Sequence, residues 1–227
     1  MKKITSVLFL FYCFSVGWAQ TVPPCTLEIT DAETFARDWT VIDVNSDVSA
    51  NTWAYNDGNA MYMQDKSNAA DDWLIAPAVT LEAGKAYKVS AYVKHSSTFG
   101  SDKQKIELKI GTAPTVEGLT TRLVYDESFQ SRLFVEKSGT FSPAESGVFY
   151  VGLRCYSESY NGDLYFQKIV IEEAPVYPAQ ITDLSIVAGE RGAMSATLSW
   201  TWPSSDHLGG ALSNLLGAKI YRGTDLV

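Results

Sequence analysis

Apolar and polar residues alternate with a period of two along much of this 227-residue chain, which is typical of strands that bury one face. The alternation is clearest over 87–94, 105–110 and 149–155, and it returns over 164–171. Turn-forming residues separate these segments, as in Asn161-Gly162-Asp163 before the last one. Many short strands with turns between them predict an all-β fold, either a β-sandwich or a jelly roll.

Helical periodicity is confined to one short segment, from Asp31 to Trp39. Phe35 and Trp39 stand four residues apart there, and Asp31 suits the N-cap position. The sequence therefore predicts a single short helix near the start of the β-rich region. Five tryptophans are expected to lie in the core: Trp39, Trp53, Trp73, Trp200 and Trp202.

The first twenty residues have the features of a secretory signal peptide. Lys2 and Lys3 precede an apolar stretch, 7–16, that is too short to span a bilayer stably. Gly17-Trp18-Ala19 places small residues at the −3 and −1 positions of a cleavage site. We therefore expect a signal peptide over 1–19, a mature chain that begins at Gln20, and a secreted or cell-surface location. No other stretch is apolar and long enough to predict a transmembrane segment.

A stretch with two prolines, 174–179, follows the acidic pair Glu172-Glu173 and predicts a linker between two units. The first unit covers 25–173. A second β pattern follows over 180–227, with alternation in 194–201 and an apolar segment at 218–222.

The net charge of −8 argues against binding to nucleic acid or to anionic membranes, because like charges repel. Two histidines and three cysteines are too few for most zinc frameworks and disulfide-rich miniproteins. Export would leave Cys25 and Cys155 in an oxidising compartment. They can form a disulfide, worth about 4–5 kcal/mol in the chain-entropy model. The alternative is a pair of unbridged, buried thiols.

Four blocks in the first unit carry a family resemblance: 71–77, 81–89, 149–157 and 164–169. In this order they resemble the cleaved-adhesin / choice-of-anchor-J jelly-roll modules of secreted Bacteroidetes proteins, which include the haemagglutinin–adhesin regions of gingipains. The upstream stretch 39–47, followed by Thr52-Trp53, fits the same pattern. The resemblance spans roughly 25–173. It implies a jelly-roll β-sandwich, an extracellular location, and an adhesive or ligand-binding role without catalysis in the module.

The second unit resembles the opening of a fibronectin type III domain. Its segment 195–200 resembles the B strand with the core Trp200, and 219–222 resembles the C strand. About fifty residues suffice for strands A to C of a seven-stranded domain. We therefore expect a partial immunoglobulin-like (fibronectin type III) β-sandwich, poorly ordered alone, in a chain that is a fragment of a longer protein.

The best chemical candidate is a metal site formed by Asp43, Asn45 and Asp47, because alternating oxygen side chains on a tight loop can converge on a hard cation. The EF-hand glycine is absent, since Val48 follows Asp47. In the resembled modules calcium is a structural ion near the sheet edges, which makes calcium the expected cofactor. The alternative is an Asx turn whose side chains cap their own backbone.

Catalytic patterns are weak. Asp71 and Asp72 are adjacent on a predicted strand, so their carboxyl groups would point to opposite faces. His95 and His207 lack a second histidine, and nothing marks an oxyanion site beside a Cys–His pair. We therefore expect no enzymatic activity.

Aromatic residues on loops and polar strand faces are candidates for stacking on sugar rings. The candidates are Tyr55, Tyr62, Tyr92, Tyr156 and Tyr160. Tyr156 and Tyr160 flank a polar loop next to Asn161, and these three form the predicted ligand site. The alternative is ordinary packing at the rim of a sandwich.

Two functions follow from the sequence. The first is a secreted, non-catalytic adhesive module that recognises an extracellular glycan or a host or surface protein. The second is an accessory N-terminal region of a larger secreted protease or glycosidase, whose catalytic domain lies outside this chain.

We expect millimolar calcium to raise the melting temperature of the protein, and Asp43→Ala to reduce the rise. A ligand that binds only the folded state stabilises it by about 2.7 kcal/mol at a hundredfold excess over its Kd. Thermal unfolding in calcium and in chelator measures the difference. Equal melting of the wild-type protein under both conditions would contradict a calcium site.

Overall fold

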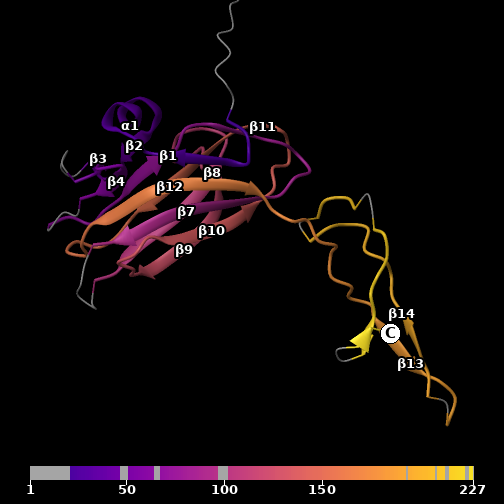
Figure 1. Cartoon of the computed structure of the whole chain (residues 1–227). Helices are drawn as coiled ribbons and strands as arrows, with labels where there is room; N and C mark the ends of the chain where they lie inside the picture. The colour runs from indigo at the N-terminus through magenta and orange to yellow at the C-terminus, as the bar shows by residue number, and fades with distance from the viewer. Residues whose placement is uncertain are drawn as a thin grey trace, which may run out of the picture.

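Figure 1 shows a computed structural model of the chain. The structure describes residues 21–46, 51–63, 67–96, 102–192, 194–207, 209–212, 215–222 and 225–226. The predicted signal peptide and Gln20 lie outside the described residues, as does Asp47.

Two antiparallel sheets account for most of the first unit, and each has six strands. Sheet A has the order β10 (Val135–Phe141), β7 (Tyr87–His95), β12 (Leu164–Glu173), β4 (Asn59–Tyr62) and β3 (Trp53–Asn56), and β1 (Cys25–Glu28) also pairs with β12. Sheet B has the order β2 (Thr40–Asp43), β5 (Asp72–Ile75), β11 (Gly147–Cys155), β8 (Gln104–Gly111) and β9 (Thr121–Phe129), and β6 (Val79–Leu81) pairs with β11. The predicted all-β jelly-roll sandwich is confirmed.

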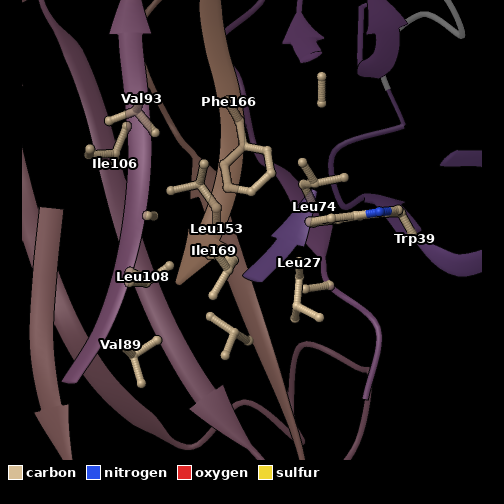
Figure 2. Close-up of a cluster of buried hydrophobic side chains, with 14 of the residues drawn as sticks. Leu27, Trp39, Leu74, Val89, Val93, Ile106, Leu108, Leu153, Phe166 and Ile169 are labelled. Carbon is tan, nitrogen blue, oxygen red and sulfur yellow. The ribbon is translucent and has the colours of Figure 1, made fainter. Parts of the chain in front are cut away.

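The core lies between the two sheets, because each sheet turns alternate apolar side chains inward. Figure 2 shows Val89, Val93 and Phe166 of sheet A near Ile106, Leu108 and Leu153 of sheet B. All six side chains are at most 2% exposed. The alternation in the sequence therefore gave the correct inward face for these strands.

The predicted helix is present as α1 (Ala32–Asp38). Asp31 is its N-cap, and the carboxylate accepts a hydrogen bond from the Thr34 amide at 2.7 Å. Trp39 ends the helix and is buried, with its ring 5.3 Å from that of Phe166 in an edge-to-face contact. Trp53 and Trp73 are also buried, as predicted.

A tight turn joins β3 to β4. Asp57 and Gly58 have φ angles of 45° and 75°, and Asn56 pairs with Asn59 across the turn. Two positive φ angles in a two-residue loop are typical of a type I′ hairpin, for which Asp-Gly is a preferred sequence. This hairpin places Tyr62 in the core at 1% exposure. The expectation that Tyr62 is exposed is therefore wrong.

The second unit contains two separate hairpins. β13 (Ser185–Ala188) pairs with β14 (Ala196–Ser199), and β15 (Tyr221–Arg222) pairs with β16 (Asp225–Leu226). Two-stranded sheets lack a second layer, so their apolar side chains stay in solvent. Trp202 is 49% exposed, which corrects its predicted core position. The fibronectin type III assignment of 180–227 and the domain boundaries stay predictions.

The cysteines Cys25 and Cys155 are both free in the structure. Cys25 lies beside Ile171, near the end of β12. Cys155 lies near the start of β12, because its thiol contacts Gln104 and the Gln104 side chain binds the Gly162 carbonyl just before that strand. The length of β12 between these points is about 23 Å at about 3.3 Å per residue. A disulfide needs Cα atoms within about 7 Å, so the fold keeps these thiols apart.

Limited proteolysis of residues 20–227 is expected to trim the second unit first and to leave a resistant core that ends near Glu173. The reason is that cleavage requires local opening, which costs little free energy where few apolar side chains are buried. Mass spectrometry of the time course identifies the fragments. Equal resistance of 21–173 and 180–227 would show that the second unit completes a stable fold.

Candidate functional site

The predicted ligand residues Tyr156, Tyr160 and Asn161 lie on one loop, 156–163, which joins β11 to β12. The loop passes from sheet B to sheet A at one end of the sandwich. The structure thus brings these residues onto one segment, but their surroundings differ.

A buried glutamine at the start of β8 anchors the loop. Gln104 is fully buried, and its Nε2 donates to the backbone carbonyls of Asn161, at 3.1 Å, and Gly162. Its Oε1 accepts hydrogen bonds from the Ser157 hydroxyl and from the Cys155 thiol, the latter at 3.3 Å. One side chain therefore fixes both ends of the loop to sheet B.

A second set of bonds fixes the loop to sheet A. The Nε2 atom of buried His95 contacts the carbonyl of Asn161. The Ser96 amide donates to the Asp163 carbonyl at 2.9 Å, and the Asp163 amide donates to the Ser96 hydroxyl at 2.7 Å. The loop is therefore held by both sheets.

The amide side chain of Asn161 is engaged within the protein. Its Oδ1 accepts from the Lys103 amide at 3.1 Å, and its Nδ2 donates to the Glu158 carbonyl at 2.9 Å. These bonds shape the loop from inside. A ligand role for Asn161 stays a prediction.

Tyr156 packs onto the outer face of sheet B. Its ring stacks on Tyr125, with centroids 5.9 Å apart, and the Arg154 guanidinium carbon lies 5.1 Å from its centroid. Burial raises the pKa of the Tyr156 hydroxyl above its ordinary value. The ring thus belongs to a layer of side chains, which matches the rim-packing alternative.

Tyr160 is different, because its side chain is 66% exposed and its φ angle is +64°. This left-handed conformation favours glycine, and a bulky residue pays about 1–3 kcal/mol to adopt it. The bonds of Gln104 and His95 on both sides of the loop hold the backbone there. The result is an exposed aromatic side chain on an anchored backbone.

The outer face of sheet B is covered next to this loop. Trp73, Ile75 and Leu119 form a small buried cluster, in which Leu119 comes from the segment between β8 and β9. A Cβ atom on Gly152 would lie 2.4 Å from Leu119, so this cover is seated tightly on the sheet. Glu107 is also buried on this sheet and pairs with Arg122 at 2.8 Å.

The outer face of sheet A carries a row of side chains that the sequence reading did not assemble. Tyr165 pairs with Met61 on one side and with Lys94 on the other, and Phe134 precedes the pair Val135–Val93. The four outward side chains Met61, Tyr165, Lys94 and Phe134 are half-buried. The alternation of β7 and β12 indicated the outward positions, but the strand pairing was needed to align them.

The predicted metal ligands lie at the end of β2. The carboxylate of Asp43 accepts a hydrogen bond from the Ser46 amide at 2.6 Å, and the Asn45 amide nitrogen donates to the Ala69 carbonyl at 2.6 Å. The Asp43 carboxylate thus caps a nearby backbone amide, as in the local-capping alternative, although three residues on rather than the two of an Asx turn. Asp47 lies outside the described residues. Within the described ranges no three His, Cys, Asp or Glu side chains converge as metal ligands. Calcium binding stays a prediction.

The residues considered as catalysts in the sequence are buried or bonded to other parts of the protein. Burial raises the pKa of the Cys155 thiol to about 12, so the nucleophilic thiolate does not form near neutral pH. Asp71 pairs with Arg154 at 2.7 Å, while Asp72 is fully buried. His207 lies in the second unit, where its ring contacts Tyr177.

No protein-family model matches the sequence, and no curated protein matches it significantly. Among solved structures, the chain is similar to the K3 and K1 cleaved adhesin domains of Lys-gingipain from Porphyromonas gingivalis W83. The K3 domain is 11% identical, with a TM-score of 0.47 over 64% of this chain and 98% of that domain. The K1 domain is 14% identical, with a TM-score of 0.46 over 66% of this chain and 99% of that domain.

A structure of a family 4 carbohydrate-binding module is 14% identical, with a TM-score of 0.42 over 66% of this chain and 94% of that one. These are likenesses of fold at low sequence identity. The choice-of-anchor-J and fibronectin parts of the expected resemblance stay predictions.

Replacing Gln104 with leucine, which has a similar volume, is expected to lower the free energy of unfolding by about 3 kcal/mol. The change leaves two carbonyls and a hydroxyl without their buried partner, at about 1–3 kcal/mol for each group. Urea unfolding measures the loss, and hydrogen exchange reports faster exchange of loop 156–163.

The matched control for this substitution is Gln180→Leu at an exposed position. It is expected to change the stability by less than about 0.5 kcal/mol. Equal stability of the two variants would contradict the anchoring role of Gln104.

Proposed function

We propose that the sandwich of this chain is a non-catalytic, extracellular glycan-binding module that uses Tyr160 as a stacking platform. The proposal rests on one observation, the exposed Tyr160 ring held in a left-handed backbone conformation on a doubly anchored loop. Strained residues persist where the surrounding structure over-determines them, and they cluster at functional sites.

The chemistry around Tyr160 suits a sugar. An aromatic face covers the apolar C–H face of a pyranose ring, and nearby polar groups bind its hydroxyls. The loop supplies the Glu158 carboxylate, which is exposed and ion-paired with Lys105 at 2.8 Å. The backbone that carries the ring is already anchored, so binding costs little backbone entropy, which favours affinity.

The proposal assigns no catalytic step to this chain. The Cys155 thiol is protonated and fully buried, and His95 is 1% exposed, so neither meets a substrate in solution. The described part of the chain contains no helix that is long and apolar enough to cross a membrane. A role as an accessory region of a larger secreted enzyme stays a prediction.

The test is Tyr160→Gly, which removes the ring and also relieves the backbone strain. We expect glycan binding to be lost while the free energy of unfolding stays equal or rises by about 1 kcal/mol. A glycan array identifies ligands of the wild-type chain, and titration calorimetry and urea unfolding compare the variants.

Tyr160→Phe and Tyr177→Ala are the matched controls. The first keeps an aromatic ring on the loop, and the second removes another exposed tyrosine, which is 60% exposed and lies outside the sandwich. Both are expected to bind as the wild type does. Undiminished binding by Tyr160→Gly, or a protein-only ligand, would overturn the proposal.

A further inference from the structure

The outer face of sheet A contains a lysine held between two aromatic rings. The Nζ atom of Lys94 lies 4.6 Å from the ring centroid of Tyr165 and 4.9 Å from that of Phe134. Each such contact is worth about 0.5–1 kcal/mol near the surface. The ammonium is therefore held on the face of the sheet, beside the end of loop 156–163.

Other cations in the described residues also lie over aromatic rings, and they differ from Lys94 in one respect. Each of them has a carboxylate within ion-pair distance: Lys109 with Glu107, Lys137 with Asp126, Lys168 with Glu28, Arg122 with Glu107 and Arg154 with Asp71. No carboxylate of the described residues lies that close to Lys94. Among the described residues, Lys94 therefore has no ion-pair partner, although the net charge of the chain is −8.

The position of Lys94 makes this charge available to a ligand. It belongs to the outward row Met61, Tyr165, Lys94 and Phe134, in which neighbouring strands lie about 4.8 Å apart. Lys94 and Tyr165 are next to His95 and Leu164, where β7 and β12 meet loop 156–163. The row therefore starts at the end of β12 that follows loop 156–163, the loop that carries Tyr160.

We propose that the sandwich binds an acidic glycan of the uronic acid type, whose carboxylate pairs with Lys94 on the outer face of sheet A. The proposal rests on the glycan-binding function proposed above and adds the charge of the ligand. The apolar parts of Met61, Tyr165 and Phe134 contact the sugar rings, and the carboxylate of the glycan supplies a counter-charge that no described carboxylate supplies to Lys94. Because the rings already hold the lysine side chain, binding orders it at little further entropic cost.

Charge explains why an acidic protein can bind such a polymer. At physiological ionic strength exposed charges are largely screened beyond about 8 Å. The net charge of the chain then contributes little at the site, whereas the attraction between Lys94 and a carboxylate in direct contact is only weakly screened. Binding is therefore expected to depend on Lys94 and to weaken with salt.

The test uses the full chain and polygalacturonate, with its fully methyl-esterified form as the neutral partner of the same backbone. Titration calorimetry is expected to show binding of the acid form and at least about tenfold weaker binding of the ester, since charged hydrogen bonds exceed neutral ones in strength. Lys94→Met is expected to weaken binding of the acid form by about tenfold or more.

Two variants serve as controls. Lys94→Arg keeps a cation between the rings and is expected to retain binding within about threefold. Lys85→Met removes the same charge at the other end of β7, where Lys85 pairs with Glu173 and Glu82, and is expected to bind as the wild type does. Unchanged melting temperatures of the variants separate loss of binding from loss of folding.

The outcomes distinguish this inference from the function on which it rests. Equal binding of acid and ester, or wild-type affinity of Lys94→Met for the acid, overturns the inference. If such results come with neutral-glycan binding that Tyr160→Gly abolishes, the proposed function stands. Failure of the wild-type chain to bind any glycan overturns both.

Discussion

The buried amide of Gln104 is the contact on which the end of the sandwich depends. Loop 156–163 must pass between two sheets, and its inward-facing carbonyls need hydrogen-bond donors once water is excluded. Gln104 supplies the donors and at the same time accepts from Ser157 and Cys155. A backbone held in this way can carry an unfavourable conformation at Tyr160, because the loop cannot relax without breaking buried bonds.

The two outer faces of the sandwich differ in how far their aromatic rings are covered and their cations are ion-paired. On sheet B, Leu119 covers Trp73, and Glu107 neutralises the cations beside it. On that face the aromatic ring is covered and the described cations are ion-paired within the protein. On sheet A, the aromatic residues remain half-buried and Lys94 has no counter-ion among the described residues. The other described cations that lie over aromatic rings are ion-paired with carboxylates, and this difference is the basis for proposing a ligand on this face.

The sequence predicted secondary structure correctly where a single local pattern, such as alternation or helix capping, determined the segment. Alternation identified β7, β8 and β11 with their correct inward faces, and the capping residue Asp31 identified α1. β12 was expected as a strand, but a bulge between Phe166 and Lys168 shifts its inward positions. β9 and β10 were not predicted, because their alternation is irregular, and the register of β9 on β8 shifts twice. Asp57-Gly58 is itself a sequence signal for the type I′ hairpin between β3 and β4. The predicted core position of Trp202 is wrong, because the two-stranded sheets of the described second unit supply no second layer to cover its ring.

The candidate site was harder to predict, because it depends on contacts between distant segments. Tyr160 was chosen correctly as an exposed ring, but nothing in its neighbours shows that Gln104, 56 residues earlier, holds the loop. Tyr165 and Lys94 lie on β12 and β7, and Phe134 immediately precedes β10, so their alignment follows from the strand register. Both features have a cost that folding alone does not require: a strained backbone at one and an uncompensated charge at the other. Local rules are commonly broken at functional sites. The strained backbone at Tyr160 and the charge of Lys94, unpaired among the described residues, are therefore the two observations that support the proposed ligand sites.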